Sequence, residues 1–459
     1  MRPRPALILL LAVVAAGVVS PITAPGKAEG VPALYDPSPE HIWNRLHDAL
    51  FVREAAAGQK YGGDTVDPLL WLHTRFLLKQ PSHGNALRVL DEFLATHAER
   101  MVQDPVKRAI LQHDLWTVFD WTVDREPEDD KDPSYDKERE ELQVRLAAVV
   151  QRLALAPKEI EELPDNYALA VASGAFAKEY DASHRDRPFL PPDLLDAGGP
   201  WVWITSASRE PAAIQHVSAF SGRSRFLIFL RLPGGRRATL EYLRALWDFP
   251  RPWTSPAAGN TQAQISTELP QFPAGTQAAL VRQMTLFDNQ GNLVPAPVTE
   301  SVQIRVYRSI SGVKENHLES DDLTALIAAT GQDCYESVLS RALLFANRSG
   351  GMRAVGREER EFPVFQSRGD DPFDAGLLAS LSLRREMMPV YAECAMCHSA
   401  GGINSVESRR LLLKPNPFHR ESPGGLPARW WENDGTADWK QQRYEWGLLN
   451  GYWRAAAGK

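Results

Sequence analysis

The sequence predicts a multidomain protein in which an N-terminal all-α region precedes a mixed or mainly β region, with a small all-α domain at the C-terminus. Apolar residues recur at helical spacing through the first part of the chain, and runs rich in aromatic and β-branched residues replace them in the middle. Helical spacing returns near the end. Because 459 residues suffice for two or three domains, we expect domains over residues 30–190, 195–365 and 370–459.

A secretory signal peptide is predicted over residues 1–28. Two arginines lie among the first four residues, and Ala6 to Val19 is uncharged and almost wholly apolar. Gly26-Lys27-Ala28 suits cleavage after Ala28. The apolar run is short for a membrane span, although an uncleaved N-terminal anchor is the alternative. Since no second run reaches spanning length, we expect an exported periplasmic or extracellular protein with no transmembrane segment in the mature chain.

The helices of the first domain follow from capping residues and apolar spacing. Ser38 is the expected N-cap of the first helix, with Pro39 at its first position. A second helix is expected to start at Pro68. Amphipathic spacing predicts further helices over 87–94, 110–121, 136–155 and 167–179, separated near residues 124–132 by a charged loop.

The middle domain is predicted from strand-like runs. These runs cover Trp201–Ile204, Phe226–Leu230, Ala278–Phe287 and Val302–Tyr307, and a short helix is expected over Leu240–Trp247. We found no internal repeat and no motif that assigns a function to this region or to the helices before it.

Net charge and cysteine content exclude several classes of protein. A net charge of −7 argues against binding to nucleic acid and to anionic membrane surfaces, because both require a basic excess. Three cysteines do not make a disulfide framework. We expect Cys334 to be a small buried residue, with a reactive thiol as the alternative.

Residues 394–398 form a C-x-x-C-H motif. Its spacing places the thiols of Cys394 and Cys397 on one turn of chain, where each is able to form a thioether with a haem vinyl group. The imidazole of His398 then lies against the iron as an axial ligand. One covalently bound haem c is therefore the predicted cofactor.

The last ninety or so residues resemble a small c-type cytochrome domain. A helix starting at Pro389 leads into the motif, as in that family, and Asp438 is the expected cap of a final helix. On the final helix Trp439, Trp446 and Trp453 form one apolar stripe. The resemblance implies that the first and last helices pack together, and that the protein transfers electrons with a redox partner protein. It covers only the last fifth of the chain.

The second axial ligand departs from the usual family pattern, because no methionine follows the motif. His419 is the only histidine downstream of the motif and is the expected sixth ligand. Met387 and Met388 are alternatives, as are His41 and His73 from the N-terminal region. Arginines 409, 410 and 420 are candidate partners of the haem propionates.

Two hypotheses of function follow from the motif, and a third does without haem. The first is an electron-transfer protein whose upstream domains dock a partner. The second is a periplasmic haem oxidoreductase, or a peroxidase or gas-binding protein with an open iron site, so the sequence leaves open whether the protein is an enzyme. In the third, the two cysteines are a dithiol or half of a metal site, but a second C-x-x-C to complete a zinc site is absent from the sequence. Oligomeric state is not indicated.

Overall fold

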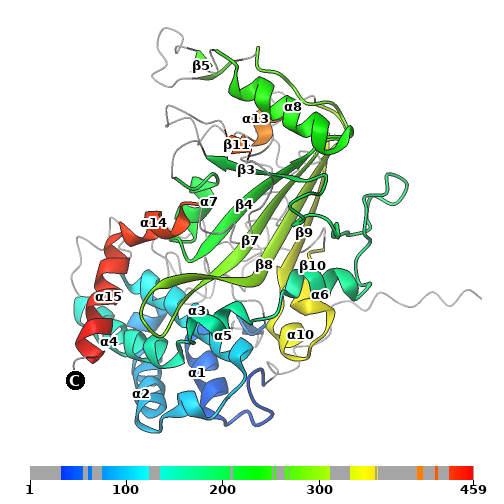
Figure 1. Cartoon of the computed structure of the whole chain (residues 1–459). Coiled ribbons are helices and arrows are strands. Elements are labelled where there is room, and N and C mark those ends of the chain that lie inside the picture. Colours follow the sequence, from blue (N-terminus) through cyan, green and yellow to red (C-terminus); the bar gives the residue numbers. More distant parts are fainter. Residues whose placement is uncertain are drawn as a thin grey trace, which may run out of the picture.

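Helical and antiparallel sheet regions make up the protein, as predicted (Figure 1). The computed structural model describes residues 33–54, 60–64, 75–123, 135–206, 210–250, 253–254, 264–266, 268–310, 331–356, 359, 398, 401–406, 419–421 and 434–457. The predicted signal peptide over residues 1–28 and the expected helix start at Pro68 lie outside these ranges.

The N-terminal region is helical, and its first four helices share an apolar core while the next two pack against the sheet. Its helices are α1 (Ile42–Phe51), α2 (Ser82–Ala95), α3 (Pro105–Val123), α4 (Asp136–Leu153), α5 (Pro157–Glu161) and α6 (Asn166–Ala172), with 3-10 turns at Phe76–Leu78 and Ala98–Arg100. Trp43 and Trp116 are fully buried in this core, and the Trp43 indole N–H donates to the Ala98 carbonyl over 2.8 Å. Burial of these apolar faces stabilises helices that would be marginal in isolation.

The start of the first helix differs from the prediction. Ser38 is not the N-cap; helix α1 begins at Ile42, and the His41 side chain accepts a hydrogen bond from the Trp43 backbone N–H. Ser38 instead lies in the preceding turn, where its carbonyl accepts from the His41 N–H. An imidazole nitrogen therefore does here what a serine hydroxyl does at many helix starts.

The middle region contains a seven-stranded antiparallel sheet, as far as the described residues go. Its strand order is β10-β9-β8-β7-β4-β3-β11, with bounds β3 (Val202–Ser206), β4 (Ser224–Arg231), β7 (Gln277–Phe287), β8 (Leu293–Tyr307), β9 (Gln332–Leu339), β10 (Met352–Ala354) and β11 (His419–Glu421). Strands β4, β7 and β8 contain three of the predicted runs, and β3 begins at Val202, one residue after the predicted start of the fourth. Long strands β4, β7 and β8 form the centre of the sheet, and the N-terminal helices lie at one end of it (Figure 1).

Short helices and turns surround the sheet. They are α7 (Ile214–Ala219), α8 (Gly235–Trp247), α10 (Arg341–Phe345), the 3-10 turn Ser349–Gly351 and α13 (Ile403–Val406). Two small antiparallel pairs, β1 (Arg53–Glu54) with β2 (Lys60–Tyr61) and β5 (Trp253–Thr254) with β6 (Gln264–Ile265), complete the described strands. Helix α8 contains the predicted helix and begins five residues before it.

The C-terminal helices pack on the N-terminal helical region. In α15 (Tyr444–Ala457), Trp446, Leu449 and Trp453 are buried within the same apolar core as α1 to α4. The rings of Trp446 and Trp453 stack on Phe287, and their centroids lie 5.1 and 5.6 Å, respectively, from the centroid of the Phe287 ring. Figure 1 shows this helix, in red, beside α4. Two tryptophans of the predicted stripe, Trp446 and Trp453, therefore belong to the core of the first region, whereas the partly buried Trp439 packs near Phe226 of β4 instead.

The small all-α domain predicted over 370–459 is not confirmed. Strand β11 pairs with β3, so this range contributes a strand to the central sheet. The predicted final helix is two helices, α14 (Thr436–Gln441) and α15, and Gly435 rather than Asp438 is the N-cap of the first. The expected contact with a helix starting at Pro389 lies outside the described residues.

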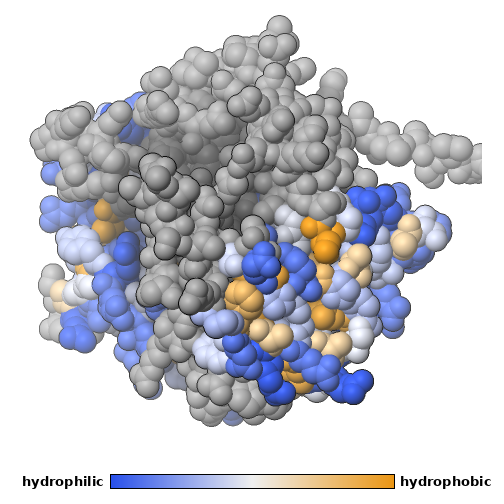
Figure 2. Space-filling view, turned by 90° about the horizontal axis from the view of Figure 1, so that it is seen from above, coloured by the Kyte–Doolittle hydropathy of each residue, from blue (hydrophilic) through white to orange (hydrophobic). Residues whose placement is uncertain are grey.

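The described surface is mainly polar on the face seen in Figure 2, where hydrophilic residues surround smaller apolar areas. None of the described helices combines the length and the apolar character that crossing a lipid bilayer requires.

Candidate functional site

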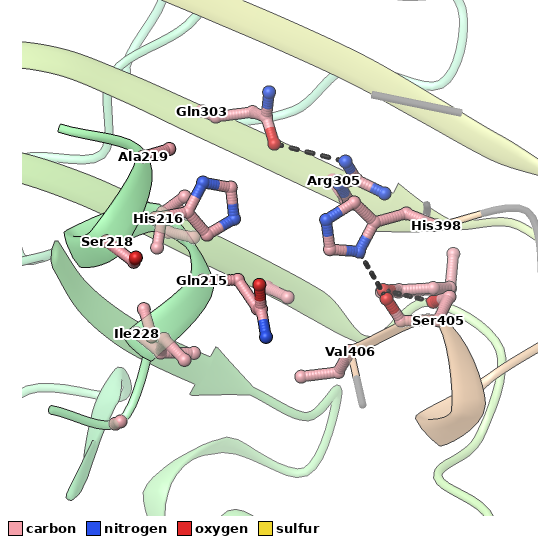
Figure 3. Close-up of a pocket in the computed structure, with 16 residues that line it drawn as sticks. Gln215, His216, Ser218, Ala219, Ile228, Gln303, Arg305, His398, Ser405 and Val406 are labelled. Atoms are coloured by element: carbon pink, nitrogen blue, oxygen red, sulfur yellow. Dashed lines mark hydrogen bonds between the residues drawn. The ribbon is translucent and has the colours of Figure 1, made fainter. Parts of the chain in front are cut away.

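A cavity of about 420 Å³ lies between α7, the central strands of the sheet and the segment that contains His398 (Figure 3). This volume falls within the range of small-molecule and cofactor pockets. Its walls come from α7 and the residues before it, from β4, β7 and β8, and from residues 398–406: Ala212, Ala213, Gln215, His216, Ser218, Ala219, Ile228, Ala278, Ala279, Leu280, Gln303, Arg305, Tyr307, His398, Ser405 and Val406.

Small side chains from the α7 side and from β7 leave room for the cavity. The position of α7 is fixed by packing on its other side. Val217 of α7 is fully buried beside Phe226 of β4. Gly222, at φ +70°, donates its N–H to the Val217 carbonyl and so ends the helix and turns the chain into β4. A side chain at Gly222 would also meet the Trp439 ring at 3.1 Å, so α14 holds this turn from outside.

The His398 ring is oriented by a hydrogen bond to the chain that follows it. Its Nδ1 lies 2.5 Å from the Ser405 carbonyl oxygen. Because a carbonyl only accepts, Nδ1 carries the proton, and Nε2 is left with its lone pair. The Ser405 hydroxyl is itself held by Tyr307 at 2.7 Å and by the Gly402 carbonyl at 2.8 Å. A histidine that binds a metal commonly has this tautomer and this kind of support.

A second imidazole faces His398 across the cavity. The ring centroid of His216, on α7, is 6.2 Å from that of His398, and the two planes differ by 10°. Figure 3 shows one nitrogen of each ring turned toward the other ring. In His398 this nitrogen is Nε2, because Nδ1 is the one bonded to Ser405. The His216 ring also packs on Phe226, with centroids 5.3 Å apart.

Both imidazoles are neutral at neutral pH. Burial, followed by the positive charges of Arg305 and Arg282, lowers the pKa of His216 to about 4. Burial and Arg305 also lower the pKa of His398 well below its ordinary value, and the Ser405 hydrogen bond opposes this only in part. Each ring therefore keeps an unprotonated nitrogen, as a metal ligand must.

Arg305 provides a buried positive charge at the cavity wall. Its guanidinium donates to the amide oxygens of Gln303 at 3.1 Å and Gln332 at 3.4 Å. Gln332 in turn donates to the His398 carbonyl at 3.1 Å, so β8 and β9 are joined to the motif by hydrogen bonds. A cation at this position suits the carboxylate of a bound group.

The residues present fit a haem better than a bare metal ion. Among the described residues, no group of three or more histidine, cysteine, aspartate or glutamate side chains is placed to hold a metal ion. A haem needs only axial ligands from the protein, because its ring nitrogens provide the other four. The cavity has one ready ligand in His398, a mainly apolar wall and a cation.

The other predicted site residues are brought together only in part. Cys394 and Cys397 lie outside the described residues, as do His73, Met387, Met388, Arg409 and Arg410. The backbone of His419 lies in β11, opposite Ser206 of β3, and that of Arg420 is next to it; their side chains are not among those described. His41 is occupied as the N-cap of α1.

His216 is the residue that sequence reasoning missed. It lies on a six-residue helix far from the motif in the sequence, and nothing in its neighbours marks it as a ligand. Cys334, expected to be buried, is only partly buried in the structure: it packs against Val355, and burial raises the pKa of its thiol.

Comparison of the chain with protein families, with curated proteins and with solved structures found no match.

Proposed function

We propose that this protein is an exported monohaem c-type cytochrome that binds its haem covalently and transfers single electrons between partner proteins. The observation that carries the proposal is His398, which ends the C-x-x-C-H motif and turns an unprotonated Nε2 into the cavity. The chemistry of the motif and the position of its histidine thus support the same cofactor.

Each residue has a defined task in this proposal. Cys394 and Cys397 form the thioethers, and His398 binds the iron through Nε2. The Ser405 carbonyl keeps the ring in place and makes it a stronger ligand. Arg305 pairs with a propionate of the haem. A haem bound here would supply a one-electron couple between ferric and ferrous iron.

The upstream regions are proposed to dock the redox partner. The chain has a net charge of −7, which would draw a partner with a basic surface toward it and raise the rate of encounter. The same attraction makes electron transfer slower at high salt.

The test is to produce the full chain in cells with a cytochrome c maturation system and to measure its visible spectrum, oxidised and reduced. We expect the haem to stay attached after denaturation and to give a c-type pyridine haemochrome band. A variant with Cys394→Ala and Cys397→Ala should lose the attached haem and its mass. A protein without a Soret band, or a double variant that keeps covalent haem, would refute the proposal.

Carbon monoxide separates this proposal from a haem enzyme or gas-binding protein. An electron-transfer haem with both axial positions filled leaves its reduced spectrum unchanged under carbon monoxide. An open iron site would shift the Soret band and would direct attention to peroxidase chemistry instead.

A further inference from the structure

We propose that His216 is the second axial ligand of the haem and binds the iron on the side opposite His398. The inference rests on the proposed haem binding, and it names a different sixth ligand from His419. Two residues far apart in the sequence would then hold one cofactor, one from the sheet region and one from the C-terminal motif.

The spacing of the two rings fits a metal between them. Metal bonds to imidazole nitrogen are about 2.0–2.1 Å long, so two trans imidazoles in one plane have ring centres about 6.3 Å apart. The observed separation between His216 and His398 is 6.2 Å, with planes that differ by 10°. Figure 3 shows one nitrogen of each ring facing the other ring, as two ligands on opposite sides of one metal would.

Neither ring is free to turn away easily, because each is held from behind. His398 is fixed by the Ser405 carbonyl, and the His216 ring lies on Phe226 at an angle of 28°. Helix α7 is in turn anchored by the buried Val217. A pair of ligands held in position before the cofactor arrives loses little conformational freedom when it binds.

The lining of the cavity also suits a largely apolar group. Five alanines line the cavity: alanines 212, 213 and 219 from the α7 side and alanines 278 and 279 from β7. Arg305, on β8, provides the positive charge that haem carboxylates need while the rest of the ring meets apolar side chains. The cavity thus offers two axial ligands, an apolar slot and a cation in one place.

The test compares His216→Ala with a matched control, His419→Ala, both as full chains matured with haem. Wild type should be low-spin and inert to carbon monoxide. Its ferric electron paramagnetic resonance spectrum should be rhombic with resolved g values, because near-parallel imidazole planes give that form and perpendicular planes give one large-g signal. His216→Ala should keep its covalent haem, bind carbon monoxide when reduced, and recover the low-spin spectrum when free imidazole is added. His419→Ala should match wild type.

A second variant covers the case in which His216→Ala does not fold. His216→Met keeps a ligand of similar reach, so we expect a low-spin haem with a raised reduction potential and without the near-infrared signature of two imidazoles. An unchanged bis-imidazole spectrum in either His216 variant would overturn the inference, as would its loss in His419→Ala.

The outcomes also separate this inference from the proposed function. If the wild-type chain carries no covalent haem, the cytochrome proposal fails. If it carries haem and the His216 variants leave the axial spectrum unchanged, only the assignment of His216 fails.

Discussion

The buried ion cluster that joins the C-terminal helix α14 to α3 gives a prediction whose size follows from its contacts. Lys440 has no exposed surface, and its ammonium group lies 2.8 Å from Asp120 and 3.3 Å from Glu445. The Asp120 carboxylate also accepts from Arg223 at 2.9 Å and from the Trp116 indole at 3.1 Å. The Asp120 carboxylate therefore pairs with two buried cations, so removing the carboxylate and removing one cation should have different effects on stability.

Removing either side should destabilise the fold, but by different amounts. Breaking a buried ion pair costs about 3–5 kcal/mol, because one charge is left without its partner. In Lys440→Met, Asp120 keeps Arg223, so we expect a loss of about 3 kcal/mol in the free energy of unfolding. In Asp120→Asn, both Lys440 and Arg223 lose a charged partner, so the loss should approach about 5 kcal/mol.

Urea unfolding followed by circular dichroism measures both losses. Lys137→Met is the matched control, because Lys137 is 81% exposed and its ion pair with Glu141 spans 3.8 Å at the surface. It should leave the unfolding free energy unchanged within error, since exposed pairs of this kind contribute little. A loss below about 1 kcal/mol in Lys440→Met, or a larger loss there than in Asp120→Asn, would refute the reasoning.

Three further predictions concern other parts of the fold. Burial lowers the pKa of His113, so below about pH 6.5 the unfolded chain binds a proton that the folded chain does not. The free energy of unfolding should therefore fall as the pH is lowered from about 7 to 5. The urea midpoint of His113→Gln should fall less than that of wild type over the same range. Trp453→Ala removes a ring packed on Phe287 and should cost about 3–5 kcal/mol of unfolding free energy in urea titrations. Cys334 should resist alkylation in the folded protein and react after denaturation, as read by mass spectrometry.

Each of these predictions has a result that contradicts it. Equal pH profiles for wild type and His113→Gln would show that this histidine titrates alike in both states. A Trp453→Ala protein as stable as a surface alanine variant such as Arg454→Ala would show that the ring is not part of the core. Rapid labelling of native Cys334 would mean that its thiol is accessible and ionised.

The local pattern of the sequence predicted much of the secondary structure, because burial of one face leaves a period that can be read along the chain. Helix α2 was found from its apolar spacing, and the central strands from their β-branched and aromatic runs. The start of β8 was missed, because Pro295 and Pro297 lie within it and proline normally indicates an edge or a break. Pro295 is tolerated opposite Thr285, where the pairing with β7 is irregular.

Long-range contacts were beyond the reach of the same reasoning. The spacing of Trp446 and Trp453 showed that one face of the helix is buried but not that the partner is Phe287, at the end of β7. For the site, the motif gave His398 directly. His216 stayed hidden because its position opposite His398 depends on how α7 lies on the sheet, and no spacing in the sequence records that.

The position of α15 also bears on when the protein can finish folding. Because Trp446, Leu449 and Trp453 lie in the core of the first helical region, helices α1 to α4 need a segment that is synthesised long after them to complete their interior. Contacts of such large sequence separation slow folding, since a long loop must close before they form. We therefore expect helices α1 to α4 to reach their final compact packing only after α15 has been synthesised and has docked on them.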